Sequence, residues 1–307
     1  MSLSRAVADS IQSVAIFGTG LIGTSIGLAL RAQGFPGSIV GWDRSPSEAR
    51  IARDRGAIDS VAEDPLAAAE RSDCIVLATP VFGILEWIDR LAPVLRRSQL
   101  VTDVGSTKQT ICERAATAFS ASDAAHFLPG HPMAGKEVYG AAHADAQLFR
   151  GAVWLFTPLE PIQKRAEDAP SQMATAWRQW VERFGSRTID LDPERHDAIC
   201  AWASHLPQML GTALAALLED VFPESEDADE NQNSGQLRAI GGRAMHEMTR
   251  LGASPFSMWR DIAQTNEEPI AAALLALEQR LALIRENLKQ PELRDQFQRA
   301  NRFRSRL

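Results

Sequence analysis

A glycine-rich stretch near the start of the chain constrains its fold more than any other feature. Residues 18–23 read Gly-Thr-Gly-Leu-Ile-Gly, directly after the apolar run Val14–Phe17, and they open an apolar-patterned segment that extends to Leu30. The order strand, glycine turn, helix gives the three glycines distinct tasks: a tight turn, close approach of the backbone to a pyrophosphate, and close packing of helix on strand. Unpaired N–H groups at the helix N-terminus favour phosphate. The stretch predicts a dinucleotide-binding unit.

Asp43 indicates which dinucleotide is bound. It ends a second strand-like run, Ser38–Trp42, and lies 20 residues after Gly23. A carboxylate there accepts a hydrogen bond from a free ribose 2′-hydroxyl and repels a 2′-phosphate, which favours NAD. Arg44 favours NADP instead, because an arginine beside the ribose can accommodate the 2′-phosphate. We expect NAD, with NADP as the less favoured cofactor.

Strands and helices continue to alternate after this unit. The apolar run Cys74–Pro80 is typical of a parallel strand buried on both faces, and a helix over Val81–Leu91 follows it. Leu100–Val104 is the next predicted strand. This alternation predicts an α/β fold with a Rossmann-type doubly wound sheet, whose ligands bind at the carboxyl ends of the strands. Two more strands, at 152–156 and 187–191, flank a predicted helix over 171–184, so the first domain is expected to span 1–190.

Two polar segments fall at the carboxyl ends of predicted strands. They are Thr79-Pro80 and Gly105-Ser106. Ser106 or Thr107 is also placed to cap the next helix, so a purely structural role for Ser106 is equally compatible with the spacing. The predicted cofactor contacts are Gly18, Thr19, Gly20, Leu21, Ile22, Gly23, Asp43, Arg44, Thr79, Pro80, Val81, Gly105 and Ser106.

From Asp192 onward the pattern predicts helices only, which form a second domain at 191–307. A second predicted helix runs from Leu237 to Leu251, after a solvated acidic loop at 224–233. The arginine-rich tail, 294–307, is expected to form a solvated terminal helix. The first helix is expected to bend at Pro207 and to carry an apolar face made of Ile199, Trp202, Leu206, Leu210 and Leu217. The last long helix is expected to carry a heptad seam made of Ile270, Leu274, Leu277, Leu281, Ile284 and Leu288. One helix cannot bury such a seam alone, so it packs within the domain or across a dimer.

Three side chains are candidates for chemistry. His131 lies among glycines and prolines, which predicts a loop histidine; it could serve as the base in an alcohol oxidation or only hydrogen-bond the backbone. His205 precedes Pro207 on the apolar face, where a satisfied core histidine is the usual alternative. Arg250 lies two helical turns after Arg243, and a guanidinium suits a carboxylate, although helical arginines usually form surface ion pairs.

Composition excludes several classes of protein. The 307 residues suit two domains, and a net charge of -7 argues against nucleic acid as a partner. The three cysteines are too few and too scattered for a disulfide framework or a zinc site. No apolar run is long enough for a membrane span, and residues 1–10 have no apolar signal core. We therefore expect a cytoplasmic protein.

The motifs together resemble those of one family, the prephenate and arogenate dehydrogenases of tyrosine biosynthesis. The resemblance implies a Rossmann domain followed by a helical domain that interlocks two subunits, so we expect a homodimer through the C-terminal helices. The length leaves no room for an appended mutase or regulatory domain, which predicts a single-activity enzyme. The matching segments are 18–25, Asp43, 78–81, 103–108, 130–135, 204–207, 249–250 and 258–262 with Asn266.

The resemblance also implies a reaction, the NAD-dependent oxidative decarboxylation of prephenate to 4-hydroxyphenylpyruvate. It implies that His131 accepts a hydrogen bond from the substrate hydroxyl and that Ser106 orients His131. Arg250 would hold a substrate carboxylate, with His205 and Trp259 nearby. Glu137 is expected at the substrate's side chain or as a gate, and Lys136 also in the substrate pocket. No metal is needed, because the cofactor takes the hydride.

Alternatives stay open at the level of sequence. Lys136 and Glu247 depart from the family's usual residues, so arogenate, or both substrates, could be oxidised. A β-hydroxyacid dehydrogenase would share the two-domain plan but rely on a lysine in the helical domain, whereas this chain offers His131 as its catalytic group. An NAD-sensing module would need neither His131 nor Arg250.

Overall fold

The computed structural model describes residues 10–121, 123–159, 169–223 and 235–306, and its first half is built on a parallel sheet. Six parallel strands lie in the order β3-β2-β1-β4-β5-β6. The order reverses between β1 and β4, which is where ligands bind in open α/β sheets. This confirms the predicted Rossmann-type fold. The strands are β1 (Ser13–Phe17), β2 (Ser38–Trp42), β3 (Ser60–Val61), β4 (Cys74–Leu77), β5 (Leu100–Asp103) and β6 (His126–Leu128).

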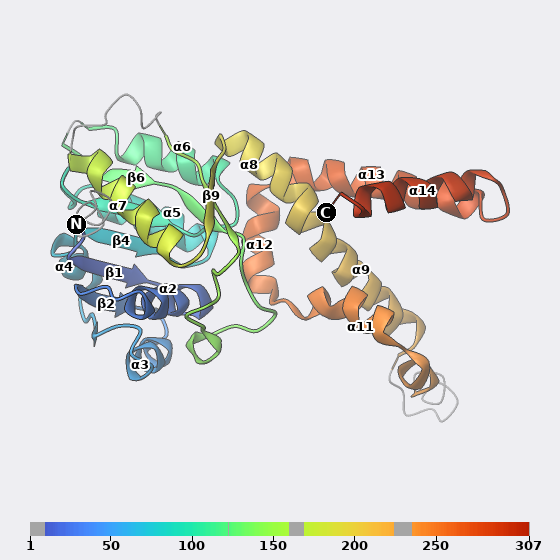
Figure 1. The fold of residues 1–307 in the computed structure, drawn as a ribbon, viewed down its shortest axis with the longest axis horizontal. Helices are drawn as coiled ribbons and strands as arrows, with labels where there is room; N and C mark the ends of the chain where they lie inside the picture. Colours follow the sequence, from blue (N-terminus) through green and yellow to red (C-terminus); the bar gives the residue numbers. More distant parts are fainter. Residues whose placement is uncertain (1–9, 122, 160–168, 224–234, 307) are drawn as a thin grey trace.

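Helices cover both faces of this sheet (Figure 1). Alternate residues of β1 enter different cores: Ile16 packs with Trp177 and Trp180, whereas Phe17 packs with Trp87. Burial on both faces explains why the parallel strands read as continuous apolar runs. The helices are α2 (Leu21–Ala32), α3 (Pro46–Asp54), α4 (Pro65–Glu70), α5 (Val81–Leu91), α6 (Gln109–Ala118) and α7 (Ala169–Arg183), with a short 3-10 turn η1 (Ala141–His143).

A second sheet of three strands adjoins the first. It consists of β7 (Gly130–Pro132), β8 (Val153–Phe156) and β9 (Arg187–Asp190), with β7 antiparallel to β8 and β8 parallel to β9. His131 pairs with Leu155 of β8, so the prediction of a loop histidine is wrong. The strand tolerates Pro132 because β7 is at the edge of its sheet, where a missing N–H costs no ladder bond.

The helical half begins as predicted. Asp192 caps α8 (Pro193–Cys200) by accepting a hydrogen bond of 2.8 Å from the Arg195 N–H. A π-helical turn, η3 (Ala201–His205), separates α8 from α9 (Leu206–Val221). Pro207 lacks an N–H for the carbonyl four residues earlier, which accounts for the interruption. The expected irregularity at Pro207 is therefore present as a π turn.

The predicted continuous helix from Leu237 to Leu251 is wrong. Residues 235–240 are helical, but Gly241 and Gly242 break the chain before α11 (Arg243–Thr249), and a 3-10 turn, η4 (Arg250–Ala253), follows. Glycine is a poor residue for a helix interior, and two in succession end it here. The acidic segment 224–233 lies outside the described residues.

The last helices are α12 (Phe256–Thr265), α13 (Glu267–Glu286) and α14 (Glu292–Arg304). In Figure 1, α13 and α14 form an arm that projects away from the sheet. The heptad seam is buried at Ile270, but Leu281 is 52% exposed, and Leu288 lies beyond the end of α13 at 62% exposed. Two of the six predicted seam residues are thus exposed within one chain. Across the described residues, no helix is long and apolar enough to cross a bilayer.

Candidate active site

The glycine turn between β1 and α2 has the geometry that a pyrophosphate requires. Gly18 has a φ of +94°, and a Cβ there would lie 2.4 Å from the carbonyl oxygen of Ala78. A Cβ on Gly23 would lie 1.9 Å from the Gly18 carbonyl oxygen, so the helix packs directly on the turn. A Cβ on Gly20 would meet nothing within 4 Å. Gly20 therefore faces open space at the N-terminus of α2.

Asp43 is fixed beside this turn, immediately after β2. Its Oδ2 accepts a hydrogen bond of 2.7 Å from the Thr19 N–H, and its Oδ1 accepts one of 2.8 Å from the Ser45 N–H. The side chain of Arg44 is 88% exposed and lies 3.8 Å from Glu86. The carboxylate is held rigidly, whereas the guanidinium is held only by a weak surface ion pair.

The start of α6 corrects one expectation. Neither Ser106 nor Thr107 caps the helix; Lys108 is the N-cap residue, and its side chain does not cap. Instead, the carboxylate of Asp197 on α8 accepts hydrogen bonds from the N–H groups of Lys108, at 2.7 Å, and Gln109, at 2.9 Å. A residue from the helical half thus caps a helix of the sheet half. Thr107 bonds Thr265 at 2.7 Å. Ser106 is half-buried and makes no side-chain hydrogen bond to the described residues.

A buried ion pair holds the carboxyl end of β5. Lys108 Nζ pairs with Asp103 Oδ2, and both side chains are fully buried. Asp103 also accepts hydrogen bonds from the N–H groups of Gly105, at 2.7 Å, and Gly130, at 3.1 Å. Because each charge has its partner, the pair is tolerated in the interior. It fixes β7, and with it His131, against the end of β5.

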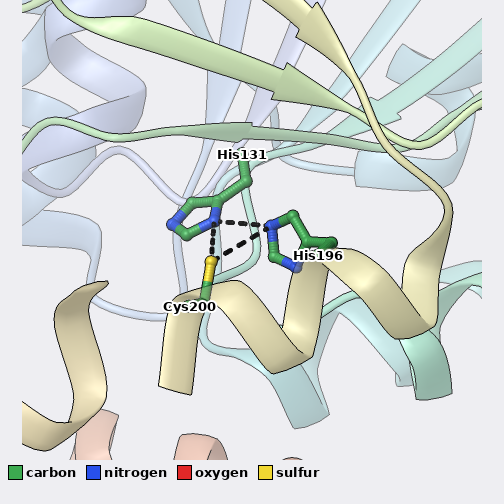
Figure 2. A group of neighbouring side chains, drawn as sticks. All are labelled: His131, His196 and Cys200. Carbon is green, nitrogen blue, oxygen red and sulfur yellow. Dashed lines mark hydrogen bonds between the residues drawn. The ribbon is translucent and has the colours of Figure 1, made fainter. Parts of the chain in front are cut away.

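His131 is the end of a chain of buried polar side chains (Figure 2). Its Nδ1 lies 2.9 Å from Nε2 of His196, and Nδ1 of His196 lies 2.7 Å from Oδ1 of Asp197. An ionised carboxylate only accepts, so His196 donates from Nδ1 and its Nε2 carries a lone pair. That lone pair accepts the Nδ1–H of His131, which leaves a lone pair on Nε2 of His131. In Figure 2 this second nitrogen points away from both neighbours.

Burial keeps the imidazoles of His131 and His196 neutral. Burial, and then the neighbouring His196, lower the pKa of His131 well below 6.5. Burial also lowers the pKa of His196, although Asp197 opposes the shift. His131 is therefore a neutral acceptor at physiological pH. Burial raises the pKa of the adjacent Cys200 thiol to about 12, so that group is protonated.

The same network reaches His205. Asn266 donates from Nδ2 to the backbone carbonyl of Asp197, at 2.9 Å, and to Nδ1 of His205, at 3.0 Å. Burial lowers the pKa of His205 to about 4. Its ring meets Trp259 edge-on, with centroids 5.8 Å apart. Within the described structure, His205 Nε2 and Trp259 Nε1 are buried without partners, which leaves two polar atoms for a ligand.

Arg250 lies in the η4 turn and pairs with Glu137, which brings two predicted substrate residues together. Gln208 on α9 fixes this turn. It donates to the Leu251 carbonyl at 2.6 Å, and Ser254 donates to its Oε1 at 3.0 Å. Arg243 pairs with Glu247 on the surface, as helical arginines usually do.

Lys136 is directed elsewhere. Its Nζ donates to the His143 carbonyl at 3.1 Å and to Asp145 at 3.4 Å. It makes no contact of this kind with the Arg250–Glu137 pair.

Sequence reasoning missed four residues of this site: His196, Asp197, Asn266 and Gln208. Each acts through a partner distant in sequence, and Asp197 meets Lys108 across 89 positions. Asn266 belonged to the resemblance but received no role. The spacing of His196 and Cys200, one helical turn apart, was the local signal available.

Comparison with known proteins decides the family. Residues 26–180 match the family described as prephenate dehydrogenase, nucleotide-binding domain, and residues 192–302 match prephenate dehydrogenase, dimerization domain. The chain belongs to the prephenate dehydrogenase family. It is 32% identical over 259 residues to the prephenate dehydrogenase of Lactococcus lactis and 28% identical over 264 residues to that of Bacillus subtilis. Each match covers 84% of this chain but 66% and 65% of the relatives, so the chain spans about two thirds of their length.

Solved structures of family members have the same fold. A prephenate dehydrogenase from A. aeolicus, in complex with hydroxyphenyl propionate and NAD+, superposes with a TM-score of 0.80 at 28% identity, covering 96% of this chain and 98% of that one. An arogenate dehydrogenase from Synechocystis superposes with a TM-score of 0.71 at 27% identity, covering 96% and 99%.

Proposed function

We propose that this member of the prephenate dehydrogenase family oxidises prephenate with NAD, releasing CO2 and 4-hydroxyphenylpyruvate. The observation that carries the proposal is the chain Asp197–His196–His131, which presents a neutral imidazole acceptor at the carboxyl edge of a dinucleotide-binding sheet. Family membership supports the same reaction.

The glycine turn between β1 and α2 fits a dinucleotide. Gly20 faces open space, and no side chain caps α2, so its first N–H groups are available to a pyrophosphate. Asp43 suits a ribose with a free 2′-hydroxyl, which favours NAD over NADP. Thr79 offers a buried Oγ1 without a partner in the described structure. When bound, the nicotinamide supplies the acceptor for the hydride.

His131 acts on the substrate hydroxyl. Its Nε2 accepts the hydroxyl hydrogen bond while the hydride leaves the ring carbon that carries this group, so that carbon gains carbonyl character. The ring carboxylate then departs as CO2, and its bonding electrons complete the aromatic ring. The oxygen keeps its proton and becomes a phenol, so no net proton transfer is required. We place Ser106 beside the nicotinamide and the substrate. We assign to His196 the role of orienting His131.

Arg250 binds a substrate carboxylate in this scheme. Its guanidinium is paired with the Glu137 carboxylate, and a substrate carboxylate would compete with Glu137 for the guanidinium. His205 and Trp259 offer their unpartnered nitrogens to the same ligand. Lys136, bonded to His143 and Asp145, supports the loop that carries Glu137.

We further propose two domains, 1–190 and 191–307, and a homodimer through the second. Apolar side chains exposed on its helices support the dimer, and sedimentation should give twice the chain mass of 33.6 kDa. The exposed apolar residues include Leu217, Val221, Leu281, Phe297 and Phe303.

The three free thiols suit a reducing compartment such as the cytoplasm, which is the location that we propose.

The direct test is NADH or NADPH formation by the purified protein with prephenate or arogenate, each with NAD and NADP. We expect the highest kcat/KM for prephenate with NAD. Faster turnover of arogenate would transfer the proposal to that substrate. Lack of turnover on both would overturn it.

A further inference from the structure

Cys200 joins His131 and His196 to form a compact group of potential metal ligands. His196 and Cys200 lie one turn apart on α8, and His131 faces them from β7 (Figure 2). The Cys200 sulfur lies 3.7 Å from Nε2 of His196 and 4.0 Å from Nδ1 of His131. The two nitrogens are 2.9 Å apart, and all three residues are buried.

This triangle is close to the one that a tetrahedral ion requires. With Zn–N bonds of about 2.0–2.1 Å and a Zn–S bond of about 2.3 Å, two nitrogens lie about 3.3 Å apart, and nitrogen and sulfur about 3.6 Å apart. Each edge observed here differs from those values by at most roughly 0.4 Å. Small side-chain rotations would therefore bring the three atoms into ligand positions.

The surroundings of His196 also match those of a metal-bound histidine. Ligating histidines usually donate their other N–H to a carboxylate, which fixes the tautomer. Asp197 accepts from His196 Nδ1 at 2.7 Å and is itself held by two backbone N–H groups of α6. His196 thus already has its lone pair on Nε2, the nitrogen near His131 and Cys200, where it accepts a hydrogen bond from His131 Nδ1 until an ion replaces that proton.

We propose that His131, His196 and Cys200 form a binding site for a thiophilic divalent cation, with Zn²⁺ as the fitting ion, and that occupancy switches the enzyme off. Binding forms a zinc–sulfur bond and releases the thiol proton to solvent. The His131 proton moves from Nδ1 to Nε2, and Nδ1 becomes a ligand. His131 then presents an N–H where the reaction needs an acceptor. The inhibition, but not the site itself, rests on the proposed dehydrogenase function.

Cobalt(II) tests the site without any assay of activity. Titration of the reduced 307-residue protein with Co²⁺ should produce a near-ultraviolet thiolate charge-transfer band and visible bands of a tetrahedral ion. The bands should saturate at one ion per chain and be bleached by Zn²⁺. The Cys200→Ser variant should lose the charge-transfer band and bind at least about tenfold more weakly. Cys112→Ser is the matched control, because Cys112 is buried but bonds Thr157 instead, and it should titrate like the wild type.

Activity measurements test the consequence. Zn²⁺ should inhibit the wild type and Cys112→Ser reversibly, with recovery on chelation, whereas the turnover of Cys200→Ser, whatever its basal value, should be the same with and without Zn²⁺. Circular dichroism and thermal unfolding of Cys200→Ser and Cys200→Ala establish that the fold is intact. Failure of Co²⁺ to bind at millimolar concentration, or an unchanged charge-transfer band in Cys200→Ser, would overturn the site. Co²⁺ binding without turnover on any substrate would overturn only the dehydrogenase proposal.

Discussion

The sheet half and the helical half of this molecule bury their apolar side chains very differently. The parallel sheet has a continuous core on each face, with Trp177 and Trp180 on one and Trp87 on the other. The core identified among the described helical residues is small: Ala201, Ile262 and Ile270, with Met209, Trp259 and Leu274 packed against it. A sheet half that completes its own core can hold a cofactor rigidly, whereas the helical half needs other surfaces to cover it.

The two halves also contribute different parts of the site. The glycine turn, Asp43 and His131 come from the sheet half, whereas Arg250 and His205 come from the helical half. Hydrogen bonds between Asp197 and the N–H groups at the start of α6, and between Thr107 and Thr265, are among the polar contacts that join them. If this division is correct, variants in the sheet half should affect kcat or cofactor choice, and variants in the helical half should affect substrate binding or stability.

The largest effect is expected for His131→Asn. Loss of the hydrogen-bond acceptor should lower kcat by roughly 10²–10⁴, the range for side chains positioned to act on a proton in the transition state, with unchanged affinity for NAD. Steady-state kinetics and calorimetric titration of NAD measure the two quantities. His143→Asn, at an exposed histidine, is the control. Normal turnover of His131→Asn would reduce His131 to a structural residue.

The second prediction concerns stability in acid. Because the pKa of His205 is about 4 in the folded protein and about 6.5 when unfolded, the unfolded state binds a proton first as pH falls. Neutral, buried His205 therefore contributes to the free energy of unfolding above pH 6.5. This contribution, up to about 3 kcal/mol, is lost as the pH falls from 6.5 to 4. Urea unfolding at a series of pH values should show this loss, and His205→Gln should reduce it. An equal pH dependence in the variant would contradict the assignment.

Arg250→Gln should act on binding. The loss of charged hydrogen bonds to a substrate carboxylate should weaken substrate binding by about 1.5–3 kcal/mol. KM should therefore rise roughly 10- to 150-fold, with a smaller change in kcat. Arg243→Gln is a matched control, because Arg243 is 90% exposed and pairs only with Glu247 among the described residues. A normal KM in Arg250→Gln would remove this residue from the substrate site.

The smallest expected effect is a change of cofactor preference. Asp43→Ala removes the carboxylate that would repel a 2′-phosphate, so the ratio of kcat/KM for NADP to that for NAD should rise about tenfold. Asp54→Ala, at an exposed position of α3, should leave the ratio unchanged. If Asp43→Ala also leaves it unchanged, then Asp43 does not reach the ribose.

Most elements of the sheet half could be predicted from the sequence, but β3, α4, β6 and β7 were not. The strand Ser38–Trp42 and the helix Val81–Leu91 have the predicted bounds, because apolar periodicity and the flanking Asp43 and Pro80 are local signals. The break at Gly241 and Gly242 was missed, because the apolar stripe continues across it.

The site was less predictable, because its arrangement is tertiary. His131 lies on a strand only because β8 pairs with it, and Ser106 does not cap α6 because Asp197 reaches it from another helix. The spacing of His196 and Cys200 is a weak signal on its own, and the importance of His196 comes from Nδ1 of His131, a residue distant in sequence, lying 2.9 Å away.

The most direct test of this account is the tautomer of His131, measured by ¹⁵N NMR on protein labelled at histidine, with His131→Asn to assign the signals. The chain from Asp197 through His196 predicts a neutral ring with a protonated Nδ1 and an unprotonated Nε2, and His196→Gln should disturb this state. A His131 that is protonated at Nε2, or at both nitrogens at neutral pH, would contradict the proposal that this imidazole accepts the hydroxyl hydrogen bond of the substrate.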